Sequence, residues 1–154
     1  KKGYEIPEFR LVINELLRWK NTNESFLVGV GALGSALLGY KGFQEYGLNI
    51  TAAFDRDPSV IGRSIHGKTV FPLERLYPLI QRMKVKIGII TVPERAAQET
   101  ANLLIRAGIR GIWNFSPVKL RVPSHVVVQR EDLSSGLAVL SVLLTEKLKE
   151  DINT

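Results

Sequence analysis

Hydrophobic positions along this chain alternate between short continuous runs and stripes at helical spacing. The run at residues 26–30 has the length of a strand, and the apolar positions that follow between Leu33 and Tyr40 recur at helical spacing. Further strands are expected downstream at residues 49–54, 69–71, 85–92, 111–115 and 126–128. Helices are expected at residues 32–46, 73–83, 93–107 and 132–149. This alternation predicts an α/β fold with a doubly wound, Rossmann-type parallel sheet.

The two ends of the chain are predicted to be helical for different reasons. A single apolar stripe follows Pro7, which predicts an N-terminal helix that packs against the sheet. The last helix has a leucine stripe at Leu133, Leu137, Leu140, Leu144 and Leu148. Further apolar residues, Ala138, Val139, Val142 and Leu143, fill most of the remaining circumference. A helix with so little polar surface is expected to be buried on two sides, by its own domain and by a partner subunit. The alternative is a central helix of this domain alone.

These patterns divide the chain into three parts. Residues 1–22 are expected to form a linker and the packing helix. Residues 23–130 are expected to form the Rossmann domain, and residues 131–154 a C-terminal dimerisation helix.

The turn between the first strand and its helix contains the pattern G-x-G-x-x-G at Gly29, Gly31 and Gly34. In a dinucleotide fold, the first glycine allows the tight turn, the second lets the backbone approach a pyrophosphate, and the third lets the helix pack on the sheet. Asp55 ends the second strand, 21 positions after Gly34, which suits an acid that binds the adenosine ribose. This acid favours NAD over NADP, although Arg56 directly after it can soften that preference. The alternative is a glycine-rich turn that binds nothing.

Ligands of a doubly wound sheet lie beyond the carboxyl ends of its strands. The candidate cofactor-binding residues are therefore Gly29, Gly31, Ala32, Leu33, Gly34, Asp55, Arg56, Thr91, Val92, Pro93, Asn114, Phe115, Ser116 and Pro117. For Asn114 and Ser116, ordinary turn chemistry before Pro117 is a serious alternative.

Composition and charge narrow the class of protein. Hydrophobic residues make up 45% of the 154 residues, and no apolar run approaches the roughly 18 residues of a membrane span. The chain has no cysteine, which fits a reducing cytoplasm, and we expect no membrane partner and no metal. The formal net charge of +6 is consistent with nucleic acid nearby or an anionic ligand, and equally with an ordinary basic surface.

Groups suited to catalysis are scarce. His66 and His125 lie in predicted loops away from the ligand crevice, and no second domain is available to hold a substrate. We therefore expect a sensor rather than an enzyme. An NAD-dependent oxidoreductase domain and a coenzyme A-binding module remain the alternatives.

Several strings of residues resemble one known family. They are Ala-Leu-Leu-Gly-Tyr-Lys-Gly-Phe at 36–43, Ala-Ala-Phe-Asp-Arg-Asp-Pro at 52–58, Ile-Gly-Ile-Ile-Thr-Val-Pro at 87–93, and Gly-Ile-Trp-Asn-Phe-Ser-Pro at 111–117. With Glu131-Asp132-Leu133 near the end, they make the chain similar to the redox-sensing transcriptional repressor Rex. The departures are Ala32, where the family often has Asn, and Ser116 in place of Ala.

The resemblance implies a homodimer that reads the NADH/NAD⁺ balance and leaves its operator DNA when NADH binds. It implies that an N-terminal winged-helix domain, almost entirely absent here, holds the DNA, and that the C-terminal helix is exchanged between subunits. Tyr40 and Asp132 lie at the positions that take part in the family's switch. The alternative roles are a packed core tyrosine for Tyr40 and a helix N-cap for Asp132. Because the chain starts at Lys1 and its only methionine is Met83, we expect it to be part of a longer protein.

Overall fold

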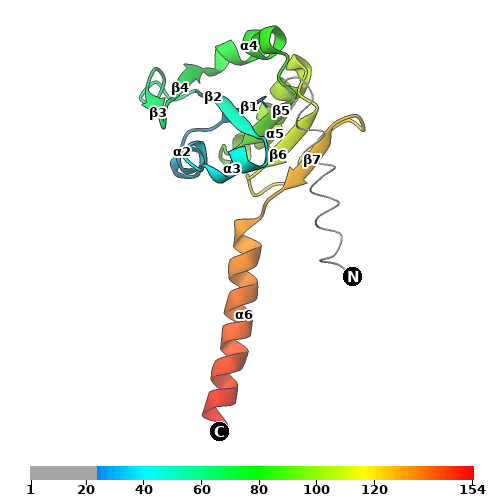
Figure 1. Ribbon diagram of the computed structural model, residues 1–154. Helices are drawn as coiled ribbons and strands as arrows, with labels where there is room; N and C mark the ends of the chain where they lie inside the picture. Colours follow the sequence, from blue (N-terminus) through cyan, green and yellow to red (C-terminus); the bar gives the residue numbers. More distant parts are fainter. Residues whose placement is uncertain (1–23) are drawn as a thin grey trace.

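A seven-stranded sheet forms the centre of the computed structural model, which describes residues 24–154 except for the side chain of Leu133 (Figure 1). The strands are β1 (Glu24–Val28), β2 (Asn49–Asp55), β3 (Ser64–Ile65), β4 (Lys68–Pro72), β5 (Ile87–Ile90), β6 (Gly111–Asn114) and β7 (Val127–Arg130). Their order across the sheet is β3-β4-β2-β1-β5-β6-β7. All neighbours pair in parallel except β3, which forms an antiparallel hairpin with β4. The packing helix predicted within residues 1–22 lies outside the described residues.

The strand order reverses next to β1. From β1 the chain builds outward through β2 and β4, and it then crosses over to build the other half through β5, β6 and β7. Such a reversal opens a crevice beyond the carboxyl ends of β1 and β5, which is where open α/β sheets bind ligands. The predicted fold class is confirmed, and the edge hairpin of β3 is an addition that the pattern did not predict.

The helices are α2 (Ala32–Leu38), α3 (Gly42–Glu45), η2 (Leu73–Arg75), α4 (Leu76–Met83), α5 (Glu94–Ala107) and α6 (Leu133–Ile152). The prediction of one helix over residues 32–46 was wrong, because the chain turns between α2 and α3. Gly39 caps α2, and a Cβ there would lie 2.5 Å from the His66 ring. A Cβ on Gly42 would meet the Tyr40 ring in the same way. Both glycines therefore permit a tight turn that a continuous helix would not contain.

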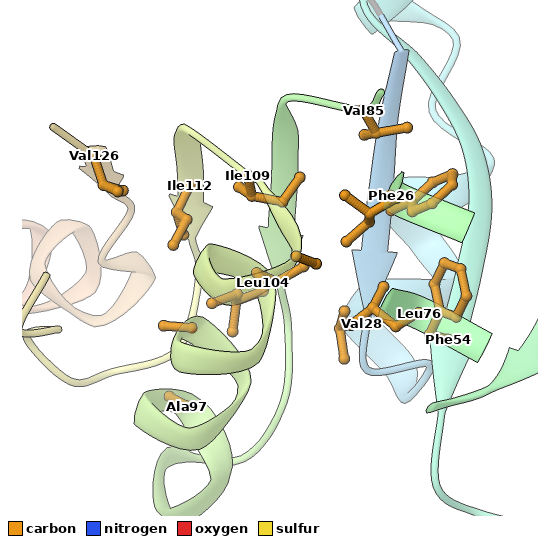
Figure 2. Packing of buried hydrophobic residues seen from close by; sticks show 14 of the residues in the cluster. Phe26, Val28, Phe54, Leu76, Val85, Ala97, Leu104, Ile109, Ile112 and Val126 are labelled. Atoms are coloured by element: carbon orange, nitrogen blue, oxygen red, sulfur yellow. The ribbon is translucent and has the colours of Figure 1, made fainter. Parts of the chain in front are cut away.

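Two hydrophobic clusters lie on opposite faces of the sheet. Side chains alternate along β1, so Phe26 and Val28 face α4 and α5, while Leu27 faces α2. Figure 2 shows Leu76 of α4 and Leu104 of α5 in the first cluster with the β1 side chains. Burial on both faces explains why the central strands are almost continuously apolar in sequence.

Helix α6 projects away from the sheet (Figure 1). Its apolar side chains are exposed, including Leu137 at 66% and Leu140 at 61% of their full accessible surface. The alternative of a central helix within the domain is therefore wrong, and so is the predicted burial of one side of the helix by its own domain. The helix also runs to Ile152, slightly beyond the predicted end. Across residues 24–154, no helix combines the length and the apolar character that crossing a membrane requires.

Candidate nucleotide-binding site

A cleft of about 740 Å³ lies beyond the carboxyl ends of β1, β2, β5 and β6. Most of the predicted residues line it, namely Gly29, Gly31, Leu33, Asp55, Arg56, Thr91, Val92, Pro93, Phe115, Ser116 and Pro117. Three predicted residues, Ala32, Gly34 and Asn114, are not part of its lining. The topology thus brings four separate strand-end loops to one crevice, as the sequence predicted.

The glycine turn is shaped by contacts with the end of β5. Gly29 has φ +107°, and a Cβ there would lie 2.7 Å from the backbone of Thr91. A Cβ on Gly34 would collide with the Gly29 carbonyl oxygen. The Thr91 hydroxyl donates to the same oxygen at 2.6 Å, which fastens the turn to β5. The predicted roles of Gly29 in the turn and of Gly34 in packing are confirmed.

Gly31 differs from the other two glycines, because a Cβ at this position would meet no atom within 4 Å. Its backbone is extended, with φ −91° and ψ −152°, so no positive φ requires glycine here. Nothing within the described protein therefore requires glycine here. Gly31 is one of the residues that line the cleft.

Asp55 holds the glycine turn and the loop after β2 together. Its Oδ2 accepts a hydrogen bond from the N–H of Val30 with 2.6 Å between the atoms, and its Oδ1 accepts from the N–H of Asp57 at 2.9 Å. The backbone N–H and the hydroxyl of Ser59 in turn lower the pKa of Asp57. Hydrogen bonds thus hold the Asp55 and Asp57 carboxylates in place. Each carboxylate oxygen can accept more than one hydrogen bond, so it can also accept from donors such as ribose hydroxyls.

The wall opposite β2 is the first half of α5. Arg95, Ala96 and Thr100 of this helix line the cleft, as does Leu73 of η2. None of these was among the predicted residues, because sequence spacing does not reveal which face of a helix turns toward the crevice. Arg56 nevertheless reaches this wall, since its Nη2 lies 3.0 Å from Oε1 of Glu99.

Asn114 does not have the predicted place in the cleft. It is fully buried, its Oδ1 accepts from the N–H of Ser116 at 3.0 Å, and its Nδ2 donates to the Val118 carbonyl at 2.9 Å. These bonds are the turn chemistry that was the alternative. Ser116 lines the cleft, but its hydroxyl donates to the Val92 carbonyl at 2.5 Å and so joins two walls.

A chain of contacts leads from the cleft to the start of α6. The ring of Phe115 lies 4.9 Å from that of Trp113, measured between centroids. The indole Nε1 of Trp113 donates to Oε2 of Glu131 at 3.1 Å. Glu131 is followed by Asp132, so the aromatic wall of the cleft and the base of α6 are connected through these contacts.

Asp132 is the N-cap of α6. Its Oδ1 accepts from the backbone N–H groups of Ser134 and Ser135, and its Oδ2 accepts from the Ser135 hydroxyl at 2.8 Å. The Ser135 hydroxyl lowers the pKa of this carboxyl most, and the nearby Arg130 lowers it further. Asp132 therefore caps α6, which was the alternative role. This cap is compatible with the predicted role of Asp132 in a switch.

Tyr40 lies outside the cleft. Its side chain is 59% exposed and its ring stacks edge-on against Phe43 at 4.8 Å. Together with Lys41 and His66, it lines another cavity of about 380 Å³ at the turn between α2 and α3. The alternative that Tyr40 is a packed core residue is therefore wrong. Within a single chain, neither Tyr40 nor Asp132 lines the cleft.

No cluster of three or more metal-ligating side chains suited to hold a metal ion occurs among residues 24–154.

Comparison with known proteins agrees with this geometry. The family described as CoA binding domain matches residues 20–118. The chain is 46% identical over 147 residues to the redox-sensing transcriptional repressor Rex of Treponema denticola, which is 96% of this chain and 70% of that protein. It is 43% identical over 138 residues to Rex of Porphyromonas gingivalis, or 90% of this chain and 63% of that one.

Solved structures of RSP, a Rex-family repressor, have the same fold. The crystal structure of RSP in complex with β-NADH superposes with a TM-score of 0.81 at 34% identity, covering 97% of this chain and 72% of RSP. RSP in complex with β-NAD⁺ and operator DNA gives a TM-score of 0.79 at 34% identity, covering 96% and 69%.

The sheet order, the glycine turn and the acid at the end of β2 define a Rossmann-type nucleotide-binding domain of the CoA-binding class. Within that class, the chain belongs to the Rex family of redox-sensing transcriptional repressors. The resemblance seen in the sequence is confirmed. The relatives are named as repressors, so the prediction of a regulatory protein rather than an enzyme is also confirmed.

Proposed function

We propose that this domain senses the NADH/NAD⁺ balance for a Rex-type repressor, and that NADH binding rearranges a homodimer so that it releases operator DNA. The observation that carries the proposal is the open space at Gly31 beside the Asp55 carboxylate. The open space at Gly31 suits a pyrophosphate that passes close to the backbone, and the Asp55 carboxylate suits an adenosine ribose. RSP, which has the same fold, has been solved with both nucleotides and with operator DNA.

The cleft walls suggest how the nucleotide lies. The pyrophosphate is placed against Gly29, Gly31 and Leu33 at the turn, and the adenosine ribose against Asp55. The nicotinamide half is placed against the loops after β5 and β6, where Pro93 and the ring of Phe115 provide an apolar wall. Ala32 and Gly34 act behind this surface by shaping the start of α2.

The homodimer is proposed to form through α6. Exposed apolar side chains on this helix include Leu137, Leu140 and Leu144, and burying each contributes roughly 1.5–3 kcal/mol. Soluble proteins rarely leave such a contiguous patch uncovered. A two-fold arrangement of α6 helices would cover the patch on both copies. The side chain of Leu133 lies outside the described residues, so its predicted part in this interface stays a prediction.

The same arrangement offers a role for the two switch residues. Exchange of α6 carries Asp132 of one subunit toward the nucleotide-binding body of the other, where Tyr40 is exposed and accessible. The contacts from Phe115 through Trp113 to Glu131 connect the cleft with this helix. Nucleotide binding can thereby change how the subunits are oriented.

The operator DNA is proposed to bind a separate N-terminal domain of a longer protein. The chain spans 70% of the Treponema denticola repressor and 63% of the Porphyromonas gingivalis one, which leaves room for such a domain in those proteins. We place the protein in the cytoplasm, in keeping with a chain that has no cysteine.

Coenzyme A is the competing ligand, because the matching family is described by it. The Asp55 carboxylate disfavours the 3′-phosphate of coenzyme A near the ribose by charge repulsion. A calorimetric titration of the purified chain with NADH, NAD⁺ and coenzyme A separates the two. Saturable binding of both nicotinamide nucleotides with weak or absent coenzyme A binding supports the proposal. Tight coenzyme A binding without NADH binding contradicts it.

A further inference from the structure

An ion pair joins the two walls of the cleft at its adenosine end. Arg56 follows β2 and lines the cleft, and its Nη2 lies 3.0 Å from Oε1 of Glu99 on α5. The side chains are 62% and 67% exposed, so the pair sits at the mouth of the cleft and not within the core. Asp55, the proposed ribose ligand, directly precedes Arg56 in the chain.

Arg56 is chemically suited to a different nucleotide from the one that Asp55 favours. A guanidinium beside the end of this strand is the group that accommodates the 2′-phosphate of NADP(H), which it binds with a planar fork of donors. Asp55 disfavours the same phosphate by repulsion, so neighbouring residues have opposite preferences. Whichever contact occupies the Arg56 guanidinium therefore influences which nucleotide is bound.

We propose that Glu99 is a specificity-determining residue, which holds the Arg56 guanidinium away from a 2′-phosphate and so reinforces the preference for NAD(H). This inference rests on the proposed binding of NADH in the cleft. In this structure the Arg56 guanidinium pairs with Glu99 and not with Asp55. Two residues then disfavour NADP(H). Asp55 repels the 2′-phosphate, and Glu99 pairs with Arg56, the side chain that would otherwise bind this phosphate.

The size of the effect follows from the exposure of the pair. Exposed ion pairs are weak and screened by salt, so we expect Glu99→Gln to tighten NADPH binding by only about two- to fivefold. NADH has no 2′-phosphate, and its affinity should stay within about twofold of the wild-type value. The change in the NADPH-to-NADH affinity ratio should shrink as salt is added.

The test compares dissociation constants for NADH and NADPH at low salt in four chains: wild type, Glu99→Gln, Glu45→Gln and the double variant Arg56→Gln/Glu99→Gln. Glu45 lies exposed on α3, on the other face of the sheet, and its replacement removes the same charge far from the cleft. We expect the affinity ratio to move toward NADPH in Glu99→Gln alone and to return to the wild-type value in the double variant.

Two results would overturn the inference while leaving the proposed function intact. In the first, the wild-type chain binds NADH, but Glu99→Gln has the same NADPH-to-NADH affinity ratio as the wild type. The other is a gain for NADPH that persists without Arg56, because Glu99 would then act through its own charge and not through the guanidinium. A wild-type chain that binds no NADH would instead reject the proposed function and this inference together.

Discussion

Asp55 and Val30 are joined by a hydrogen bond of 2.6 Å from the backbone N–H of Val30 to Oδ2 of the carboxylate. The residue expected to bind the ribose therefore also fastens the glycine turn to the end of β2. Its second oxygen, which accepts from the N–H of Asp57, fixes the following loop. A substitution at Asp55 is expected to affect both ligand binding and the shape of the turn.

Replacing Asp55 separates these two effects. Asp55→Ala should weaken NADH binding by roughly 1.5–3 kcal/mol, because a charged acceptor is lost, and should narrow the gap to NADPH. Asp55→Asn keeps one oxygen for the Val30 N–H but turns its amide NH₂ toward the N–H of Asp57, so its thermal stability should lie between those of Asp55→Ala and the wild type. Calorimetry with both nucleotides measures the first effect. If the wild-type chain binds NADPH as tightly as NADH, the assigned role of Asp55 is wrong.

Gly31 and Gly34 provide a matched pair of substitutions. Gly31→Val should lose no more than about 1 kcal/mol of stability, since a Cβ there meets no atom within 4 Å and the cost arises from valine being a poor N-cap for α2, but it should lose NADH binding by blocking the pyrophosphate. Gly34→Val should instead lose about 1–3 kcal/mol or more of stability, because its side chain collides with the backbone of Gly29. Unfolding curves and NADH titrations distinguish the two. Unchanged NADH affinity in Gly31→Val would show that the pyrophosphate does not bind at this turn.

The dimer interface can be probed with charges on α6. The double variant Leu140→Glu/Leu144→Glu should give monomers or aggregates, because carboxylates cannot be buried between apolar helices without partners. Lys147→Glu is the control, since it changes the charge at a position that is already charged and exposed. Light scattering at micromolar concentration measures the mass. A clean monomer for the unmodified chain would rule out the dimer and the proposed exchange of α6.

The cap of α6 predicts a dependence on pH. The Ser135 hydroxyl lowers the pKa of Asp132 in the folded chain, so the charged cap stabilises α6 above the carboxyl's ordinary pKa of about 4. This stabilisation should fade as the pH falls through the lowered pKa. Carbon-13 NMR of the Asp132 carboxyl follows its titration, and circular dichroism follows the helix. Asp132→Ala should lower the helix content of α6 at neutral pH and show no such pH dependence from this site.

Local patterns in the sequence predicted the parallel sheet, the end of α5 at Gly108, the glycine turn and the acid after β2. Each depends on neighbours in sequence, such as apolar runs or a glycine with positive φ. The break between α2 and α3 was missed, and so was the close approach of Gly39 to the His66 ring, because only the fold brings these two residues together.

Side-chain placement within the crevice was harder to predict. Asn114 is the last residue of β6, a position typical of a ligand-binding amide, but its side chain is bonded to Ser116 and Val118 and does not line the cleft. Arg95 and Glu99 were missed because the orientation of α5 about its axis is set by packing on the sheet. Tyr40 was placed by resemblance alone, and its position in a single chain does not reveal what a partner subunit brings to it.

The central claim is that NADH binds in the cleft at the carboxyl ends of β1, β2, β5 and β6, and amide NMR tests it most directly. On titration with NADH, we expect the largest shifts at the backbone N–H groups of Val30, Gly31, Leu33 and Ser116. NAD⁺ should shift the same resonances. An unchanged spectrum at millimolar NADH, or shifts confined to the cavity around Tyr40 and His66, would contradict the account.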